Sequence, residues 1–403
     1  MVVATPAASA RWQFGLGREN GLIFWALIFL EAAFGSYFAL WPIWIEELDA
    51  PVTLVGALLG LGGVLRLFVL LPSAWLSRRF GMKRVMIISR AIATVGIFSA
   101  AFAPSWPWLL PALLGMAVGD LAFPLASTFV ARNAGDRRVR AFAIIFTTGP
   151  SVSLLVTPLL SGALVATFGL QAPFVTAAAF SLISIALMAR LRTIPPSDDS
   201  DPRQGGYRGL LRVPGLRTLL ILQFLAFFAI GMGTSLLSIF LHEAKGYSEA
   251  VIPPMTALTA VGSIVFSTIV ARSLRLSGAP LRAVAITIGI TACAFLLFLR
   301  AELLPFVLVA MTLRGGFFAA WPLYSAALGE ATPERLRPHV FAMGEILAGT
   351  GFVLAPVAAG PLYEIRPELP LLLAAAMIAP LVVIIGTRAN RPMEQSVNVE
   401  VNR

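Results

Sequence analysis

The sequence predicts an all-α polytopic membrane protein with twelve transmembrane helices, and three observations lead to that class. Of its 403 residues, 58% are hydrophobic and only 12% are charged, about half the charged fraction of an ordinary soluble protein. The apolar residues gather in runs of roughly 20, the length of helix that crosses the hydrocarbon core of a bilayer. The breaks between these runs hold prolines, glycines and charges, as connections between spans do.

The apolar runs, taken in order, give the expected spans. Breaks such as Pro104–Pro107 and Asn133–Gly135 separate consecutive runs. The expected spans are residues 21–45, 53–76, 84–103, 106–130, 141–168, 171–190, 218–241, 250–273, 281–300, 303–328, 340–363 and 368–387. The polar stretch between the second and third runs, Leu76–Arg84, is expected to be a hairpin loop.

The basic residues outside the spans lie almost entirely at one face, and the exceptions are Lys245, Arg300 and Arg366. Cytoplasmic loops carry an excess of Lys and Arg. We therefore expect a multi-pass protein of the inner (cytoplasmic) membrane with both termini cytoplasmic. This topology accounts for the net charge of +10 without a nucleic-acid partner.

The sequence offers little for covalent or metal chemistry. The single Cys293 lies in an apolar run, and the two histidines, His242 and His339, fall near loop ends. No catalytic Ser/His/Asp set and no phosphate-binding glycine loop is found. We expect no cofactor, no metal site and no enzymatic activity.

The two halves of the chain resemble each other at a nearly constant offset. Phe123-Pro124-Leu125 returns as Trp321-Pro322-Leu323, and other pairs follow in the same order: Asp136-Arg137 with Glu334-Arg335, Pro158 with Pro356, and Gly162 with Gly360. This indicates duplication of a six-helix unit, with pseudo-twofold symmetry between the two bundles. The expected domains are an N-terminal bundle (1–191), a cytoplasmic linker (192–217) and a C-terminal bundle (218–403).

The stretch after the second span carries a family pattern. A small residue, a leucine, an arginine and a closing glycine stand at Ala74, Leu76, Arg79 and Gly81. This spacing resembles the loop between the second and third helices of the major facilitator superfamily of secondary transporters. Arg78 stands where the family usually has an acidic residue.

The resemblance implies two bundles with substrate bound near the bilayer midplane. It also implies that helices 1, 4, 7 and 10 line a central cavity. Gly149-Pro150 is similar to part of the signature of drug:proton antiporters, although Ser153-Leu154 stand where that signature has further glycines.

Six charged residues fall inside the expected spans, where charges are costly and therefore functional candidates. They are Glu31, Arg66, Arg90, Asp120, Arg314 and Glu345. Arg90 and Glu345 lie near the cytoplasmic ends of their spans, and the other four lie near the midplane. The resemblance would place Glu31, Asp120 and Arg314 around the cavity.

The two midplane acids are the candidates for proton coupling. A carboxyl group in a poorly hydrated cavity is easier to protonate, whereas a neighbouring arginine stabilises its ionised form. Glu31 is either such a site or a permanent partner of Arg66. Asp120 is either a second proton or cation site or a structural partner of Arg314.

The substrate-binding candidates are Arg314, Gln223, Phe227 and Phe228. The guanidinium of Arg314 suits a carboxylate of the protein or of a substrate. The aromatic rings could hold an apolar substrate, but most phenylalanines of such a chain simply face lipid or other helices.

The remaining candidates are expected to act in gating through a charge network. They are the charged residues Arg66, Arg79, Arg90 and Glu345, together with Gly81. Glu345 is expected to meet either Arg90 or the basic loops.

These observations predict a secondary active transporter of a small organic solute that works by alternating access, with proton-coupled efflux of a drug or metabolite in first place. Proton-coupled uptake of a sugar, nucleoside or aromatic acid is the alternative. A non-transporting receptor on the same scaffold is an alternative of another class. The expected partners are a small-molecule substrate, protons and the lipid bilayer, and we expect a monomer.

Overall fold

The computed structural model describes residues 11–133, 141–142, 144–193, 213, 215–273, 276, 279–333 and 336–389. Twelve helices in this part of the chain are long and apolar enough to cross a membrane, as the sequence predicts. The linker predicted at 192–217 lies almost wholly outside the described residues, as do the repeat pairs Asp136-Arg137 and Glu334-Arg335.

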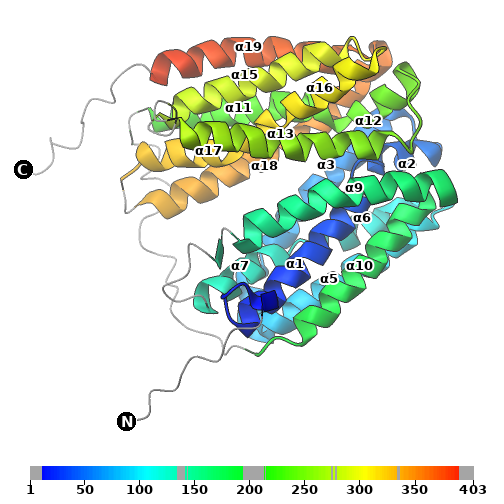
Figure 1. Cartoon of the computed structure of the whole chain (residues 1–403), viewed down its shortest axis with the longest axis vertical. Coiled ribbons are helices and arrows are strands. Elements are labelled where there is room, and N and C mark those ends of the chain that lie inside the picture. Colours follow the sequence, from blue (N-terminus) through cyan, green and yellow to red (C-terminus); the bar gives the residue numbers. More distant parts are fainter. Residues whose placement is uncertain are drawn as a thin grey trace, which may run out of the picture. The chain divides into compact units, whose positions relative to one another are not determined.

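The chain forms two compact units, one of Met1–Ser200 with Gly246–Ala257 and one of Asp201–Lys245 with Leu258–Arg403. In the first unit α1 packs beside α9 and α10, and α5 packs between α6 and α10 (Figure 1). The helices of this unit are α1 (Arg18–Tyr37), α2 (Trp41–Glu47), α3 (Val52–Leu70), α4 (Ser73–Phe80), α5 (Met82–Ala101), α6 (Leu109–Gly119), α7 (Ala122–Asn133), α9 (Gly149–Phe168) and α10 (Gln171–Ala189).

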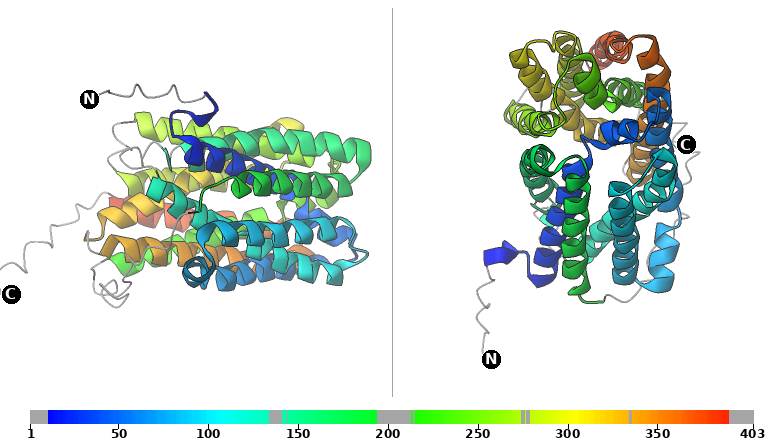
Figure 2. Two further views of the ribbon diagram at one scale, coloured as in Figure 1. Left: turned by 90° about the horizontal axis from the view of Figure 1, so that it is seen from below. Right: turned by 90° about the vertical axis from the view of Figure 1, so that its right-hand side faces the viewer.

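In the second unit α11 packs along α18 and α19, and α15 packs against α16, α17 and α19. Two further views show that the spans of each unit run alongside one another (Figure 2). The helices of this unit are α11 (Leu216–Ser235), α12 (Leu237–Ile239), α15 (Pro280–Phe298), α16 (Leu304–Arg314), α17 (Gly316–Glu330), α18 (Arg337–Ile365) and α19 (Leu369–Ala389), with α13 (Ile252–Arg272) from Leu258 onward.

Both units are apolar outside as well as inside. Side chains such as Val95, Leu71 and Val383 are exposed, although they are as hydrophobic as the buried core residues Ile23 and Phe295. Exposed apolar side chains on long helices suit a hydrocarbon environment, which has no water to satisfy polar groups.

The expected hairpin at Leu76–Arg84 is instead mostly helical, because α4 covers Ser73–Phe80. This helix ends at Gly81, whose φ of +83° is readily adopted only by glycine. Arg79 lies over the rings of Trp75 and Phe80, at 5.5 and 5.7 Å from their centres. Basic residues in the last turn also interact favourably with the helix dipole.

Several expected spans are divided, among them 21–45 into α1 and α2, and two of them break near their middle. The span at 106–130 breaks between α6 and α7, because Pro124 has no N–H to donate to the carbonyl group of Asp120. That carbonyl accepts instead from the N–H of Phe123, at 3.2 Å.

The other break is between α16 and α17, at Gly315. Here the backbones cross with no side chain between them. A Cβ atom on Gly262 of α13 would overlap the carbonyl oxygen of Thr312, and one on Gly315 would overlap the backbone nitrogen of Ser263. Two glycines facing each other therefore allow the close approach of these spans.

Candidate functional site

The charged residues inside the membrane spans of the first unit come from four different helical segments. Glu31 lies on α1, Arg66 on α3 and Arg90 on α5, and Asp120 lies at the break between α6 and α7. These four residues are far apart in sequence, yet the electrostatic field at Glu31 includes contributions from Asp120, Arg90 and Arg66. The fold therefore gathers two carboxylates and two guanidinium groups.

Arg66 and Asp120 form an ion pair, with 3.0 Å between Nε and Oδ2. Their side chains are 60% and 43% exposed, although both lie well within membrane spans. A charged side chain in contact with lipid costs several kcal/mol, so such residues face a protein interior or a water-filled space. An exposed ion pair at this depth is therefore expected to face water or another part of the protein and not lipid. The pairing of Glu31 with Arg66 is not found among the described residues of this unit. The pairing of Asp120 with Arg314 stays a prediction, because the two residues belong to different units.

Arg90 is held differently, because it is only 5% exposed. Its Nη2 donates to Ser181 Oγ of α10 at 2.8 Å, and Ser181 Oγ lies 2.7 Å from Thr94 Oγ1. Thr94 donates to the carbonyl oxygen of Arg90 at 2.7 Å, so its oxygen remains free to accept from Ser181. This arrangement fixes the buried guanidinium between α5 and α10.

Gly119 makes room for Arg90. A Cβ atom on Gly119 would lie 2.5 Å from Ala93 Cβ and 3.0 Å from Arg90 Nη1. Because Asp120 is the next residue along the chain, the glycine brings the buried cation and the ion-paired carboxylate into one neighbourhood. Glu31 is half-buried in the same region, and among the described residues no hydrogen bond fixes its carboxylate.

The two candidates on the connection after the second span lie apart from this cluster. Arg79 ends α4 in contact with Trp75 and Phe80, and Gly81 forms the turn that follows. The structure gives them a role in shaping this connection, and their participation in a gate stays a prediction.

The second unit holds two membrane-spanning charges. Arg314 is the last residue of α16, and its Nη1 lies 3.7 Å from the weak acceptor Met311 Sδ. Glu345 of α18 accepts a hydrogen bond from Trp321 Nε1 at 2.9 Å and is exposed. In the described part of the second unit the partner of Glu345 is Trp321, and the expected contacts of Glu345 with Arg90 or with the basic loops stay predictions.

Trp321 belongs to an aromatic cluster that joins α11, α17 and α18. It stacks on Phe352 with 5.8 Å between ring centres and 10° between ring planes. Phe227, which is fully buried, meets Trp321 edge-on at 4.8 Å and also contacts the rings of Phe317, Tyr324 and Phe352. The cluster holds the indole ring in place and aims its N–H at Glu345.

The other substrate candidates differ in accessibility. Gln223 is buried beside Gly344 of α18, and its Oε1 has no hydrogen-bond partner among the described residues. Phe228 is partly exposed and stacks with Phe224 at 6.2 Å. Of these residues, Phe228 is placed to touch a substrate, whereas Phe227 and Gln223 are enclosed; the binding role of all three stays a prediction.

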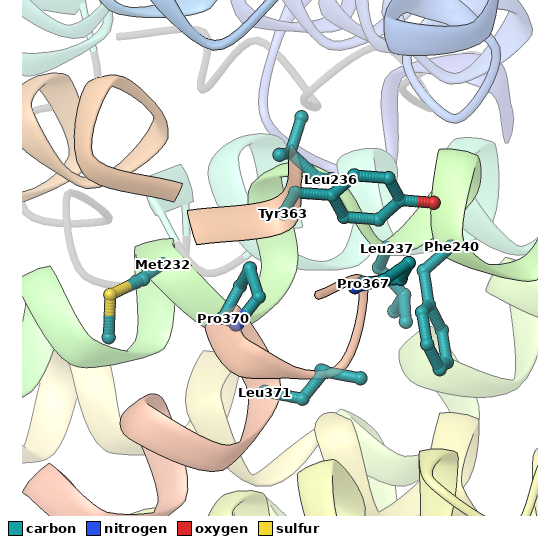
Figure 3. Close-up of a pocket in the computed structure, with 9 residues that line it drawn as sticks. Met232, Leu236, Leu237, Phe240, Tyr363, Pro367, Pro370 and Leu371 are labelled. Atoms are coloured by element: carbon teal, nitrogen blue, oxygen red, sulfur yellow. The ribbon is translucent and has the colours of Figure 1, made fainter. Parts of the chain in front are cut away.

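A small apolar cavity lies elsewhere in the second unit, between α11, α12 and the start of α19 (Figure 3). Its volume is about 10 Å³, room for no more than a water molecule. Within either unit taken alone, the described His, Cys, Asp and Glu residues form no cluster suited to a metal ion.

Sequence reasoning missed three residues of these sites: Thr94, Ser181 and Trp321. Thr94 lies four residues after Arg90, on the same face of one helix, and this spacing could have indicated it. Ser181 is a single hydroxyl in an apolar run, and nothing in the sequence distinguishes it. Trp321 stood out only as part of the internal repeat.

Comparisons with known proteins give one family. The family model of the Major Facilitator Superfamily matches residues 23–356, whereas no curated protein sequence matches the chain. Among solved structures, a variant of the nucleoside transporter NupG has a TM-score of 0.78 at 16% identity, covering 93% of this chain and 100% of that one.

Two further solved structures share the fold. The human organic anion transporter MFSD10 has a TM-score of 0.66 at 18% identity and covers 91% of this chain and 98% of its own. A POT family transporter in complex with a peptide conjugate has a TM-score of 0.75 at 12% identity, with coverages of 95% and 99%. At these identities the likeness concerns the fold, and with the family model it leads to one conclusion: this multi-pass membrane protein belongs to the Major Facilitator Superfamily of transporters.

Proposed function

We propose that the protein is a proton-coupled secondary transporter that exports a small organic solute, a drug or a metabolite, in exchange for protons by alternating access. The observation that carries this proposal is the Arg66–Asp120 ion pair, which is exposed at mid-depth of the spans. An exposed charge pair at this depth requires water and not lipid, and a water-filled space within the spans is what a translocation path needs. A pair with a purely structural role would not need to be exposed.

Proton coupling rests on the grouping of Glu31 with Asp120, Arg66 and Arg90. When all four groups are ionised, their charges cancel. Protonation of one carboxylate leaves one guanidinium unbalanced, and a charge inside the membrane is costly. The helices must then rearrange or the cluster must bind a counter-charge, and this links proton uptake to a change of conformation.

Glu31 is the proposed proton carrier, with Asp120 as the second site. Asp120 is already bound to Arg66, so proton uptake by Asp120 would break an ion pair. The carboxylate of Glu31 has no fixed hydrogen-bond donor among the described residues, so it can exchange a proton without breaking an ion pair.

The direction of transport is proposed to be outward, supported by Gly149-Pro150 at the start of α9 and by the acid on α1. Both features resemble drug:proton antiporters. Uptake with protons is the second candidate, favoured by the fold likeness to a nucleoside transporter. We further propose an inner-membrane monomer with both termini in the cytoplasm.

Reconstitution in liposomes tests the proposal. Labelled sugars, nucleosides, aromatic acids and cationic dyes are screened for uptake under an imposed pH gradient. We expect Glu31→Gln to abolish proton-driven transport while protein remains folded in the membrane. Glu302→Gln is the matched control, because Glu302 lies outside the spans, and it should transport normally. Undiminished transport by Glu31→Gln would refute the role of Glu31.

A pH-sensitive dye inside the same liposomes gives the direction of proton movement. When substrate is added outside, exchange makes the lumen more alkaline and co-transport makes it more acidic. Binding of substrate with no transport under any gradient would favour the receptor alternative.

A further inference from the structure

Two charged residues inside the spans of the second unit, Arg314 and Glu345, have no ion-pair partner in the described part of that unit. In the described part of this unit, no carboxylate lies within ion-pair distance of Arg314, and no cation lies within that distance of Glu345. The contacts they make are to neutral groups, Met311 Sδ and Trp321 Nε1. Because an isolated charge inside a membrane span is costly, we expect both residues to be in contact with water or a ligand.

The two charges belong to one strip of side chains. Arg314 and Trp321 are seven residues apart, which is close to two helical turns, so they lie on the same face about 10 Å apart along the axis. Gly315 has φ −57° and ψ −20°, so the right-handed helical backbone continues across the break. Phe318, four residues after Arg314, lies on that face too and is 43% exposed.

Glu345 completes the strip from the neighbouring helix, through its hydrogen bond to Trp321. In order along the strip come a guanidinium, an exposed phenyl ring, an indole and a carboxylate. The indole is fixed by Phe352 and Phe227, so the distance between the charged ends is held by packed helices and not by mobile loops.

We infer that this strip, named here the Arg314–Glu345 strip, binds the two ends of a zwitterionic organic substrate. A carboxylate of the substrate binds Arg314, whose forked donors suit it. An ammonium group binds Glu345 beside the indole of Trp321, which attracts cations through its ring face. The apolar body of the substrate covers Phe318. This inference rests on the proposed transport function and adds the substrate class.

Straight-chain ω-amino acids from aminohexanoate to aminodecanoate are suitable probes, and octanoate and octylamine are singly charged controls of matched length. Binding to the full-length protein in lipid nanodiscs is measured by calorimetry. We expect aminooctanoate to bind about tenfold or more tightly than either control, since each charged end adds its own hydrogen bonds.

Single variants separate the two ends. Arg314→Gln should weaken the binding of octanoate and aminooctanoate by about tenfold or more and leave octylamine binding unchanged. Glu345→Gln should weaken the binding of octylamine and aminooctanoate by a similar factor and leave octanoate binding unchanged. Arg314→Lys, which keeps the charge and loses the fork, should weaken octanoate binding less than Arg314→Gln does. Glu302→Gln should change none of these affinities.

The inference is overturned if no ω-amino acid of the series binds better than the singly charged controls. It is also overturned if Arg314→Gln weakens octylamine as much as octanoate, since that result indicates a general loss of structure. The binding assay needs no proton gradient. A negative binding result would therefore reject the zwitterion site alone, whereas proton coupling is tested separately with Glu31→Gln.

Discussion

The two units differ in how the charged side chains inside their membrane spans are neutralised. In the first unit Arg66 is paired with Asp120, Arg90 is tied to Ser181, and Glu31 lies within their field. In the second unit neither Arg314 nor Glu345 has a partner of opposite charge among the described residues. The first set can stay neutral by itself and needs only a proton to disturb it. The second set is balanced only when something else binds.

The aromatic residues differ as well, and they give the largest expected effect. Phe227 is fully buried among four aromatic rings of the second unit, so Phe227→Ala should reduce the free energy of unfolding by about 3–5 kcal/mol. Phe228→Ala is the matched control on the same helix and should cost less than half as much, because Phe228 is partly exposed. Chemical unfolding in detergent measures both.

The opposite result would reassign Phe227. If Phe227→Ala kept its stability and lost only ligand affinity, the ring would serve the substrate, as the sequence predicts, and the aromatic cluster would not be the support of the strip.

The buried arginine of the first unit gives the next effect. Ser181→Ala removes the hydroxyl that accepts from Arg90, and an unsatisfied buried donor costs about 1–3 kcal/mol of unfolding free energy. Thr167→Ala, at an exposed hydroxyl bonded only within its own helix, should change stability little. Equal stability of the Ser181 variant and the unmodified protein would show that Arg90 is hydrated, and the contrast between buried and exposed charges in this unit would fail.

The ion pair itself should contribute less. Because Arg66 and Asp120 are substantially exposed, a double-mutant cycle with Arg66→Gln and Asp120→Asn should give a coupling of about 1 kcal/mol or less. A coupling of about 3 kcal/mol or more would mean that the pair is shielded from water. That outcome would contradict the expected contact with water on which the proposed function rests.

A charge pair outside the spans of the second unit gives the smallest effect. Lys245 donates hydrogen bonds to the carboxylate of Glu302 and, at 3.2 Å, to the carbonyl oxygen of Leu299. The hydrogen bond from Lys245 holds the pKa of Glu302 below its ordinary value of 4.5. The stabilisation is therefore present at neutral pH and is lost as the pH falls through the lowered pKa.

The thermal midpoints of the unmodified protein and of Lys245→Gln should accordingly differ slightly near pH 7 and converge as the pH falls through the lowered pKa of Glu302. A difference that grows in acid would show that Lys245 acts through Leu299 and not through Glu302. Arg314 has no carboxylate partner among the described residues, so the Lys245–Glu302 pair shows how a neutralised charge of the same unit behaves.

The spans could be predicted from the sequence, because a run of about 20 apolar residues is the length that crosses a bilayer. The family could be predicted from the pattern at Ala74, Leu76, Arg79 and Gly81. The sequence was also sufficient to select the six charged candidates, since charge inside a span is rare. It was insufficient for their partners. Arg90 and Ser181 are 91 positions apart, and only the packing of α5 on α10 brings them together.

Helix breaks show the same limit at two prolines of the internal repeat. Pro124 lies in the first turn of α7 and ends the helix before it, whereas Pro322 lies inside α17. The break in that span is instead at Gly315, where α13 approaches closely. A proline has a local effect on the backbone, but the neighbouring helix determines where the span divides.

The glycine contact between α13 and the α16–α17 junction has a mechanical consequence. With no side chain separating Gly262 from Thr312 or Gly315 from Ser263, the two spans cannot slide past each other there without collision of their backbones. They can still swivel about the point of contact. Arg314 is one residue from that hinge, so a rocking of α16 would turn its guanidinium through an arc while its depth in the bilayer stayed nearly constant.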